Sequence, residues 1–392
     1  MMGRVVRNAL RSGKFRIAAV VLLCVAIAVV LLPRAAFADT LDELENEINS
    51  GLGNIDFSAM ESVSQPFFES FAEKVRQIIN GEFDSAAGFF EIVSSMFGSN
   101  LSAILPQLIS IFVVLVICGL ARRTSSGFIS EDTEKVISFV GLTVVIISVL
   151  SLVVEAYRQV SEMLSRVSAL TDAAMPILLT LVIANGGSAL SSVCQPSMVV
   201  FSSVVINVVQ KVIFPLSVFG MAFVVVSNIS DNVRVSKTSQ FLNSTSAWVL
   251  GVTFMLFSAF TTVQGISAST IDGVSYRAAK FAAKNYIPIL GGYISDGFDI
   301  IVASTSLIKN AFGAVSMLLV LLITLQPLVT LVCVNLGLQA VAAVSEPIVE
   351  EKYVKMLTGI SKCLNFLAAL VIAVAFMFCI LALVAICSAN VL

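Results

Sequence analysis

The sequence contains no histidine and few charged residues. Histidine is the commonest general base and metal ligand, so its absence excludes Ser-His-Asp triads, Cys-His nucleophiles and histidine-bound zinc. Charged residues make up only 12% of the 392, about half of their share in soluble domains. Seven cysteines are present, but no two have the Cys-x-x-Cys spacing of a metal or redox site. We therefore expect no enzyme activity, no metal site and no cofactor.

Apolar residues, in contrast, are abundant, at 58% of the chain. Residues 101–120, 136–154 and 363–387 contain no charged residue, and each run has the length that a helix needs to cross a bilayer. The predicted fold class is an all-α, polytopic helical membrane protein. Its transmembrane domain is expected over residues 101–392, in contact with membrane lipid.

Residues 1–38 have the three parts of a secretory signal peptide. Five basic residues lie within the first 16, an apolar run covers residues 17–32, and Ala36 and Ala38 supply the small residues before a cleavage site. We expect cleavage after Ala38, which leaves the following segment outside the cytoplasm. The alternative is an uncleaved N-terminal membrane anchor.

Residues 39–100 form an acidic segment with two amphipathic helical patterns. Twelve Asp or Glu residues stand against Lys74 and Arg76, so this segment offers no surface for nucleic acid. The second apolar stripe contains Phe67, Phe71 and Val75 at helical spacing. Two such stripes cannot build much of a core alone. The segment is either a helical extracytoplasmic cap on the membrane domain or a docking surface for a partner.

Basic residues predict the topology, because positively charged loops stay in the cytoplasm. Arg122 and Arg123 follow the first crossing, so this loop faces the cytoplasm and the acidic segment faces outward. After the second crossing, residues 155–174 are amphipathic and are expected to lie along the outer membrane surface. Residues 175–229 then hold either three short crossings or a re-entrant hairpin and one long tilted helix. Residues 312–344 are long enough for two short crossings, divided at a Gln-Pro step.

Residues 171–196 are apolar enough to enter a bilayer, yet they contain residues that interrupt helices. These residues are Pro176, Asn185, Gly186, Gly187, Gln195 and Pro196. Irregular backbone survives at membrane depth only where protein buries it or a wet cavity borders it. Broken helices are typical of the centres of transporters and channels. The alternatives are ordinary kinks, with Asn185 and Gln195 as hydrogen-bonding links between helices.

When the sequence is compared with itself at a shift of 112 residues, several features coincide. This predicts two parallel repeats over residues 136–247 and 248–359. Pro176 then falls on Pro288. Residue identity elsewhere is slight, and chance similarity between apolar stretches is the alternative.

In the second copy, the stretch that corresponds to residues 171–196 is also interrupted. Its positions of interest are Pro288, Gly291, Gly292, Asp296 and Asp299. Ionisable residues at membrane depth are costly and are functional candidates by default. The alternative for both aspartates is a place at the level of the lipid headgroups, where they cost little.

The run Thr-Asp-Ala-Ala-Met-Pro-Ile-Leu-Leu-Thr-Leu, followed by Gly-Gly and Gln-Pro within residues 171–196, resembles the stage III sporulation protein AE family. The run Tyr-Ile-Pro-Ile-Leu-Gly-Gly-Tyr at 286–293 supports the resemblance, which covers essentially the whole chain. It implies a multi-pass protein of the mother-cell membrane around the forespore. Other stage III sporulation membrane proteins are the implied partners, in a channel or secretion-like complex needed for late forespore development. It implies no catalytic residues.

Two functions are therefore expected from the sequence. The leading hypothesis is a membrane subunit of that complex, and a homo-oligomer is compatible with this role. The alternative is a self-contained permease or secondary transporter, with a site between the two repeats that is lined by Asn185, Asp296 and Asp299.

Overall fold

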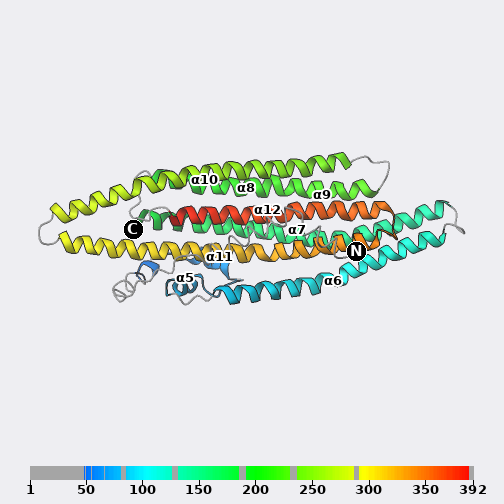
Figure 1. The fold of residues 1–392 in the computed structure, drawn as a ribbon, viewed down its shortest axis with the longest axis horizontal. Coiled ribbons are helices and arrows are strands. Elements are labelled where there is room, and N and C mark those ends of the chain that lie inside the picture. The colour runs from blue at the N-terminus through cyan, green and yellow to red at the C-terminus, as the bar shows by residue number, and fades with distance from the viewer. Residues whose placement is uncertain are drawn as a thin grey trace.

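The computed structural model describes most of the chain beyond the predicted signal peptide, which lies outside the described part. The described residues are 48, 50–53, 55–65, 67–80, 85–125, 131–184, 191–229, 236–286 and 291–387. Within them, every regular element is a helix (Figure 1). Six stretches are long and apolar enough to cross a membrane. The prediction of an all-α, polytopic helical membrane protein is confirmed.

The long helices lie side by side in one elongated bundle (Figure 1). They are α6 (Ser85–Ser125), α7 (Glu131–Ala184), α8 (Ser191–Val208), α9 (Phe214–Ile229), α10 (Ser236–Tyr286), α11 (Gly291–Ser345) and α12 (Glu351–Cys387). The π-helix η1 (Val209–Ile213) joins α8 to α9. Two short helices, α4 (Ser58–Ser64) and α5 (Phe71–Ile79), precede the bundle.

The chain reverses direction at both ends of the bundle. It turns between α6 and α7, between α9 and α10, and between α11 and α12 at one end, which we call the basic end (Figure 1). Arg122 lies in the last turn of α6, Arg234 in the connection between α9 and α10, and Lys352 in the first turn of α12. The last part of α6 is close to the connection between α11 and α12, because a Cβ on Gly119 would meet Ile348. The other two reversals, between α7 and α8 and between α10 and α11, lie at the opposite end.

On α6 and at the start of α7, exposed apolar side chains form a band next to the basic end. On α6 they recur about every fourth residue, at Leu101, Leu105, Ile109, Val113, Ile117 and Leu120. This stripe covers 20 residues, about 30 Å of helix, which matches the hydrocarbon thickness of a bilayer. We call the level of α6 residues 101–120 the membrane belt. Exposed apolar residues of α7 at the same end, Phe139, Val144 and Ile147, continue it.

Several helices are too long for the belt. α7 has 54 residues and α11 has 55. At 1.5 Å per residue both measure about 80 Å, against about 30 Å of hydrocarbon. A bilayer at the membrane belt leaves the opposite part of the bundle outside the hydrocarbon.

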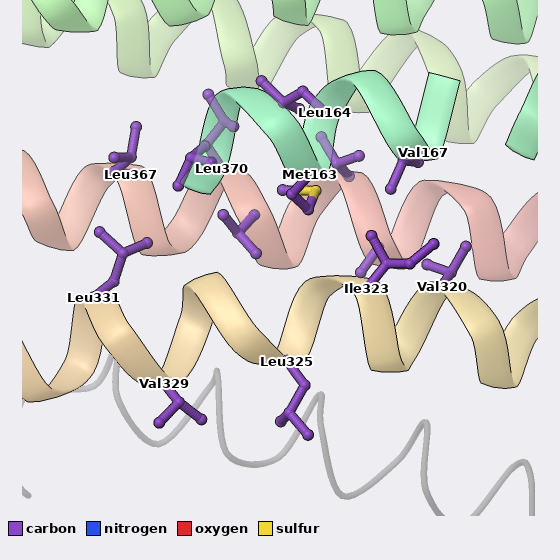
Figure 2. Packing of buried hydrophobic residues seen from close by; sticks show 14 of the residues in the cluster. Met163, Leu164, Val167, Val320, Ile323, Leu325, Val329, Leu331, Leu367 and Leu370 are labelled. Atoms are coloured by element: carbon purple, nitrogen blue, oxygen red, sulfur yellow. The ribbon is translucent and has the colours of Figure 1, made fainter. Parts of the chain in front are cut away.

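The centre of the bundle is filled by α11. In its most apolar window 78% of the residues are buried, against 28% in α6 and in α10. Phe312, Val315 and Leu319 are fully buried. Figure 2 shows side chains of α7, such as Met163 and Val167, gathered with those of α11 and α12 in one apolar cluster.

The acidic N-terminal segment packs on this bundle as a cap. α5 begins at an N-cap, in which Ser70 Oγ accepts a hydrogen bond from the Glu73 amide at 3.3 Å. Its Phe71 ring lies edge-on to Phe312 of α11, with 5.3 Å between the ring centroids. Phe71 and Val75 are fully buried, so the stripe that contains them is not a free docking surface. The structure agrees with the cap interpretation.

Residues 155–174 do not lie along the membrane surface. They continue α7 along the bundle, and their apolar face, including Val160 and Leu170, is fully buried. The exposed Arg158 pairs with Glu155 and Glu162 on the same helix. The prediction of an amphipathic helix was correct. Its location was not, because the apolar face packs on other helices of the bundle instead of on lipid headgroups.

Prolines interrupt fewer helices than expected. α7 runs through Pro176, and α11 runs through Pro327, so the prediction of two short crossings within residues 312–344 is wrong. One proline removes a single backbone hydrogen bond, and packing in a bundle can compensate for that loss. Near Pro215 the helix widens into η1 but continues. Three short crossings within residues 175–229 are therefore wrong, because α7 ends within them and α8–η1–α9 follows as one continuous helix. This agrees with the long helix of the second interpretation, whose re-entrant hairpin stays a prediction.

The helix order fits the predicted repeat. α7 with α8–η1–α9 forms one long hairpin that starts at the basic end, and α10 with α11 forms the next. The superposition of these two hairpins stays a prediction.

Candidate functional site

The residues predicted to shape a site flank the two reversals at the opposite end of the bundle. Pro176 is exposed on α7, Gln195 and Pro196 lie in α8, and Gly291, Gly292, Asp296 and Asp299 lie in the first turns of α11. Asn185, Gly186, Gly187 and Pro288 lie outside the described residues, as do the side chains of the named residues of α8 and α11. The fold thus brings both interrupted stretches to one end of the bundle. Their functional roles stay predictions.

These positions are far from the membrane belt. Asp296 precedes Ser345, at the basic end of α11, by 49 residues. At the helical rise this is about 74 Å, more than twice the thickness of the hydrocarbon.

A different group of polar residues lies between α11 and α12. Asn335 Nδ2 donates a hydrogen bond to Asn365 Oδ1 at 2.8 Å. Gln339 Nε2 donates to Ser361 Oγ at 2.9 Å and to Asn335 Oδ1 at 3.1 Å. Ser361 Oγ also donates to Asn335 Oδ1. We call these four residues the amide network.

The amide network lies within the membrane belt. Thr330 Oγ1 of α11 donates to Asn100 Oδ1 of α6 at 2.9 Å, which sets Thr330 level with the outer edge of the belt. Gly337 of α11 lies against Leu108, near the middle of the belt. Asn335 and Gln339 stand on either side of Gly337. Side-chain hydrogen bonds at this depth link membrane helices, here α11 to α12.

Among the side chains that the structure describes, one basic residue is completely enclosed. Lys309 of α11 has no exposed surface, and it lies one residue from Ile308, which reaches toward the cap at Gly51. Lysine is almost never fully buried, so this position is unusual. Asn310 Oδ1, beside it, is buried and makes no hydrogen bond within the described residues.

Sequence reasoning missed both Lys309 and the amide network. Lys309 could have been found from the sequence, because it is the single basic residue between positions 300 and 351, within a long apolar stretch. For the amide network the signal was weaker. Asn335 and Gln339 have the i, i+4 spacing of one helix face, but their partners lie on another helix.

The fold and the amide network together define a multi-pass membrane protein in which polar side chains join two of the long apolar helices. The chain belongs to the stage III sporulation protein AE family, whose model matches residues 69–389. It is 24% identical to stage III sporulation protein AE of Bacillus subtilis (strain 168) over 313 residues, which cover 79% of this chain and 78% of the relative. No solved structure matches the chain. The resemblance seen in residues 171–196 is confirmed, and with it a role in sporulation.

Proposed function

We propose that the protein is a membrane subunit of a sporulation-specific channel or secretion-like complex that connects the mother cell and the forespore. It lies in the mother-cell membrane around the forespore, with other stage III sporulation membrane proteins as partners. Membership of the family supports the sporulation role. The basic connections support an orientation with the basic end in the cytoplasm and the cap outside.

The observation that carries the subunit role is the packed centre of the bundle. Phe312, Val315 and Leu319 of α11 fill the position where a passage through a single chain would run. Such side chains pack at the density of an organic crystal and leave no room for a solute. A passage would therefore have to form between this chain and its neighbours.

A self-contained permease has less support. It needs Asn185, Asp296 and Asp299 near the middle of the bilayer. The backbone of Asp296 instead lies in the second turn of α11, about 74 Å along the helix from the basic end. A bilayer at the membrane belt leaves that turn outside the hydrocarbon.

Isolation of the tagged full-length chain from sporulating cells tests the proposal. We expect other stage III sporulation membrane proteins to copurify, and deletion of the gene to abolish heat-resistant spores. The double variant Asp296→Asn, Asp299→Asn should still support sporulation. The permease would instead be favoured if the chain purifies alone, transports a solute into lipid vesicles and loses that transport in the double variant.

A further inference from the structure

The exposed apolar surface of the bundle reaches different levels at its two edges. α6 lies along one edge, and α8, α9 and α10 lie along the other (Figure 1). On α7, which packs on α6, the exposed apolar side chains of the membrane belt stop at Val154. At the other edge they continue toward the opposite end. We call the following six exposed side chains the apolar flank: Trp248, Leu256 and Val263 of α10, Val200 and Val204 of α8, and Val212 of η1.

Contacts between helices show how far the apolar flank extends beyond the belt. Tyr157 of α7 lies against Phe214 of α9, with 5.9 Å between the ring centroids, so Phe214 is level with the outer edge of the belt. Val200 precedes Phe214 by 14 residues, which is about 20 Å along the helix. α10 runs antiparallel to α8 and α9 and reaches the same level at Val263, in the register set by the contact of Gly220 with α10.

Over the same 20 Å the surface of α7 is charged. In residues 155–182, which the structure describes in full, no large apolar side chain is exposed. The exposed charged residues there are Arg158, Glu162, Arg166 and Asp172. At one level of the bundle, water thus suits one side and hydrocarbon suits the other.

The border between the two surfaces runs along α8. Ser203 faces α7, because its Oγ donates a hydrogen bond to Asp172 Oδ1 at 3.0 Å. Asn207 and Lys211 follow Ser203 at intervals of four residues, on the same face of the helix, and both are exposed. The valines of the apolar flank occupy the adjacent face, away from α7.

We propose that lipid hydrocarbon covers the apolar flank, and that the bundle is therefore tilted in the bilayer. The flank continues the belt, since no charged residue stands between Lys237 and Asp272 on α10. The apolar stretches of this edge, Lys237–Val263 and Ser197–Ile229, have 27 and 33 residues. At 1.5 Å per residue they measure about 40 and 50 Å, and tilting is how a stretch longer than the hydrocarbon is accommodated.

The size of the step agrees with a tilt of ordinary magnitude. α6 contacts α11, α11 contacts α12, and α12 contacts α10, so about three interhelical spacings of 8 to 10 Å separate the edges. Across this width a tilt of about 30 to 40° shifts the bilayer boundary by about 15 to 25 Å. The inference goes beyond the sporulation role and does not depend on it.

The tilt also accounts for the exposed Lys362 of α12. The neighbouring Cys363 accepts a hydrogen bond at Sγ from Asn243 Nδ2 of α10 at 3.4 Å. In an upright bundle this level is near the middle of the belt, where an exposed ammonium group is costly. In the tilted bundle the bilayer at the α10 edge is displaced toward the opposite end. Lys362 then lies near the cytoplasmic headgroups, which its long side chain can reach.

Cysteine labelling at one level of the bundle tests the tilt. The full-length chain, with its seven native cysteines replaced, would carry Leu256→Cys on the flank or Ser165→Cys on α7, at the same distance from the basic end. The purified chain would be placed in phosphatidylethanolamine–phosphatidylglycerol vesicles with a charged maleimide on both sides. We expect Ser165→Cys to be labelled completely and Leu256→Cys to be labelled only after detergent is added. Equal labelling of the two variants, or equal protection, would overturn the proposal.

A fluorescence measurement distinguishes lipid from protein as the cover. Trp248 is the single tryptophan of the chain, so Trp248→Phe leaves a silent background. In this background Leu256→Trp should lose most of its emission in vesicles of lipids with brominated acyl chains, while Ser165→Trp at the same level should keep its emission. If Leu256→Trp is not quenched although Leu256→Cys is protected, a second copy of the chain covers the flank, and the proposal is wrong.

Discussion

Phe71 is the residue that fixes the N-terminal cap to the bundle. Its ring is fully buried and contacts two others, Phe57 at 6.0 Å and Phe312 at 5.3 Å between centroids. Aromatic rings at these separations contribute both buried area and edge-to-face attraction. Together with Phe57, whose ring also lies near Phe312, this side chain packs the cap against the central helix α11.

We expect Phe71→Ala to lower the free energy of unfolding by about 3 to 5 kcal/mol, because it leaves a cavity between the cap and α11. The thermal unfolding midpoint of the purified chain in detergent would measure this. Phe67→Ala, on the same stripe but only half-buried, should cost clearly less. Equal losses for both would show that the cap does not pack through Phe71.

Gly337 provides a second test at the level of single residues. A Cβ at this position would overlap the side chain of Leu108 on α6. Overpacking of this kind costs about 1 to 3 kcal/mol, so Gly337→Ala should destabilise the bundle. Adding Leu108→Ala should restore part of that loss in a double-mutant cycle.

Gly251 on α10 is the matched control for this cycle, because nothing lies near its Cβ position. Gly251→Ala should be neutral, or stabilising by up to about 1 kcal/mol through helix propensity. Additive effects of Gly337→Ala and Leu108→Ala would contradict the close contact of α6 with α11.

At the scale of elements, the main feature is that helices continue through prolines. Pro176 is exposed within α7, where it leaves the carbonyl group of Asp172 without its helical donor. We expect Pro176→Leu to raise the free energy of unfolding, by up to about 3 kcal/mol, in the same thermal assay. A loss of stability would mean that the helix needs a break there. A stable variant with reduced spore formation would support the functional role predicted for Pro176.

The sequence predicted the crossings better than the helix ends. Charge-free runs such as residues 101–120 have the length of a bilayer, so they identify crossings without tertiary information. The pattern of residues 155–174 was ambiguous, since an amphipathic helix on a membrane and one on a bundle expose the same charged face. Proline breaks were overestimated, because the packing that tolerates Pro327 comes from helices distant in sequence. The amide network could not be predicted either, because Asn335 and Asn365 lie on different helices that meet only in the folded bundle.

At the scale of the whole molecule, the bundle is longer than the membrane is thick. Thr180 of α7 is exposed and lies 49 residues from Glu131, about 74 Å along the helix. A bilayer at the membrane belt leaves Thr180 in water on the side opposite the basic end. The sequence alone had placed residues 175–184 inside the membrane.

Cysteine labelling distinguishes the two arrangements. In the cysteine-free chain, Thr180→Cys should react with a membrane-impermeant maleimide added from outside, while Ile109→Cys within the belt should not. Labelling is measured by the mass shift of the full-length protein. If Thr180→Cys stays unlabelled until detergent is added, the bilayer covers the far half of α7 and the belt is misplaced.

The contact between α6 and α11 has a consequence for synthesis. The two helices run in the same direction and meet where Thr330 bonds to Asn100, 230 residues earlier in the chain. A ribosome adding about 5 to 20 residues per second needs about 12 to 46 s to make the chain between them. During this interval α6 can pack only on α7, and Asn100 Oδ1 has not yet received its hydrogen bond from Thr330. The first crossing made is thus among the last to be completed, and the nascent chain depends on the membrane, or on an insertion factor within it, to hold α6 until α11 arrives.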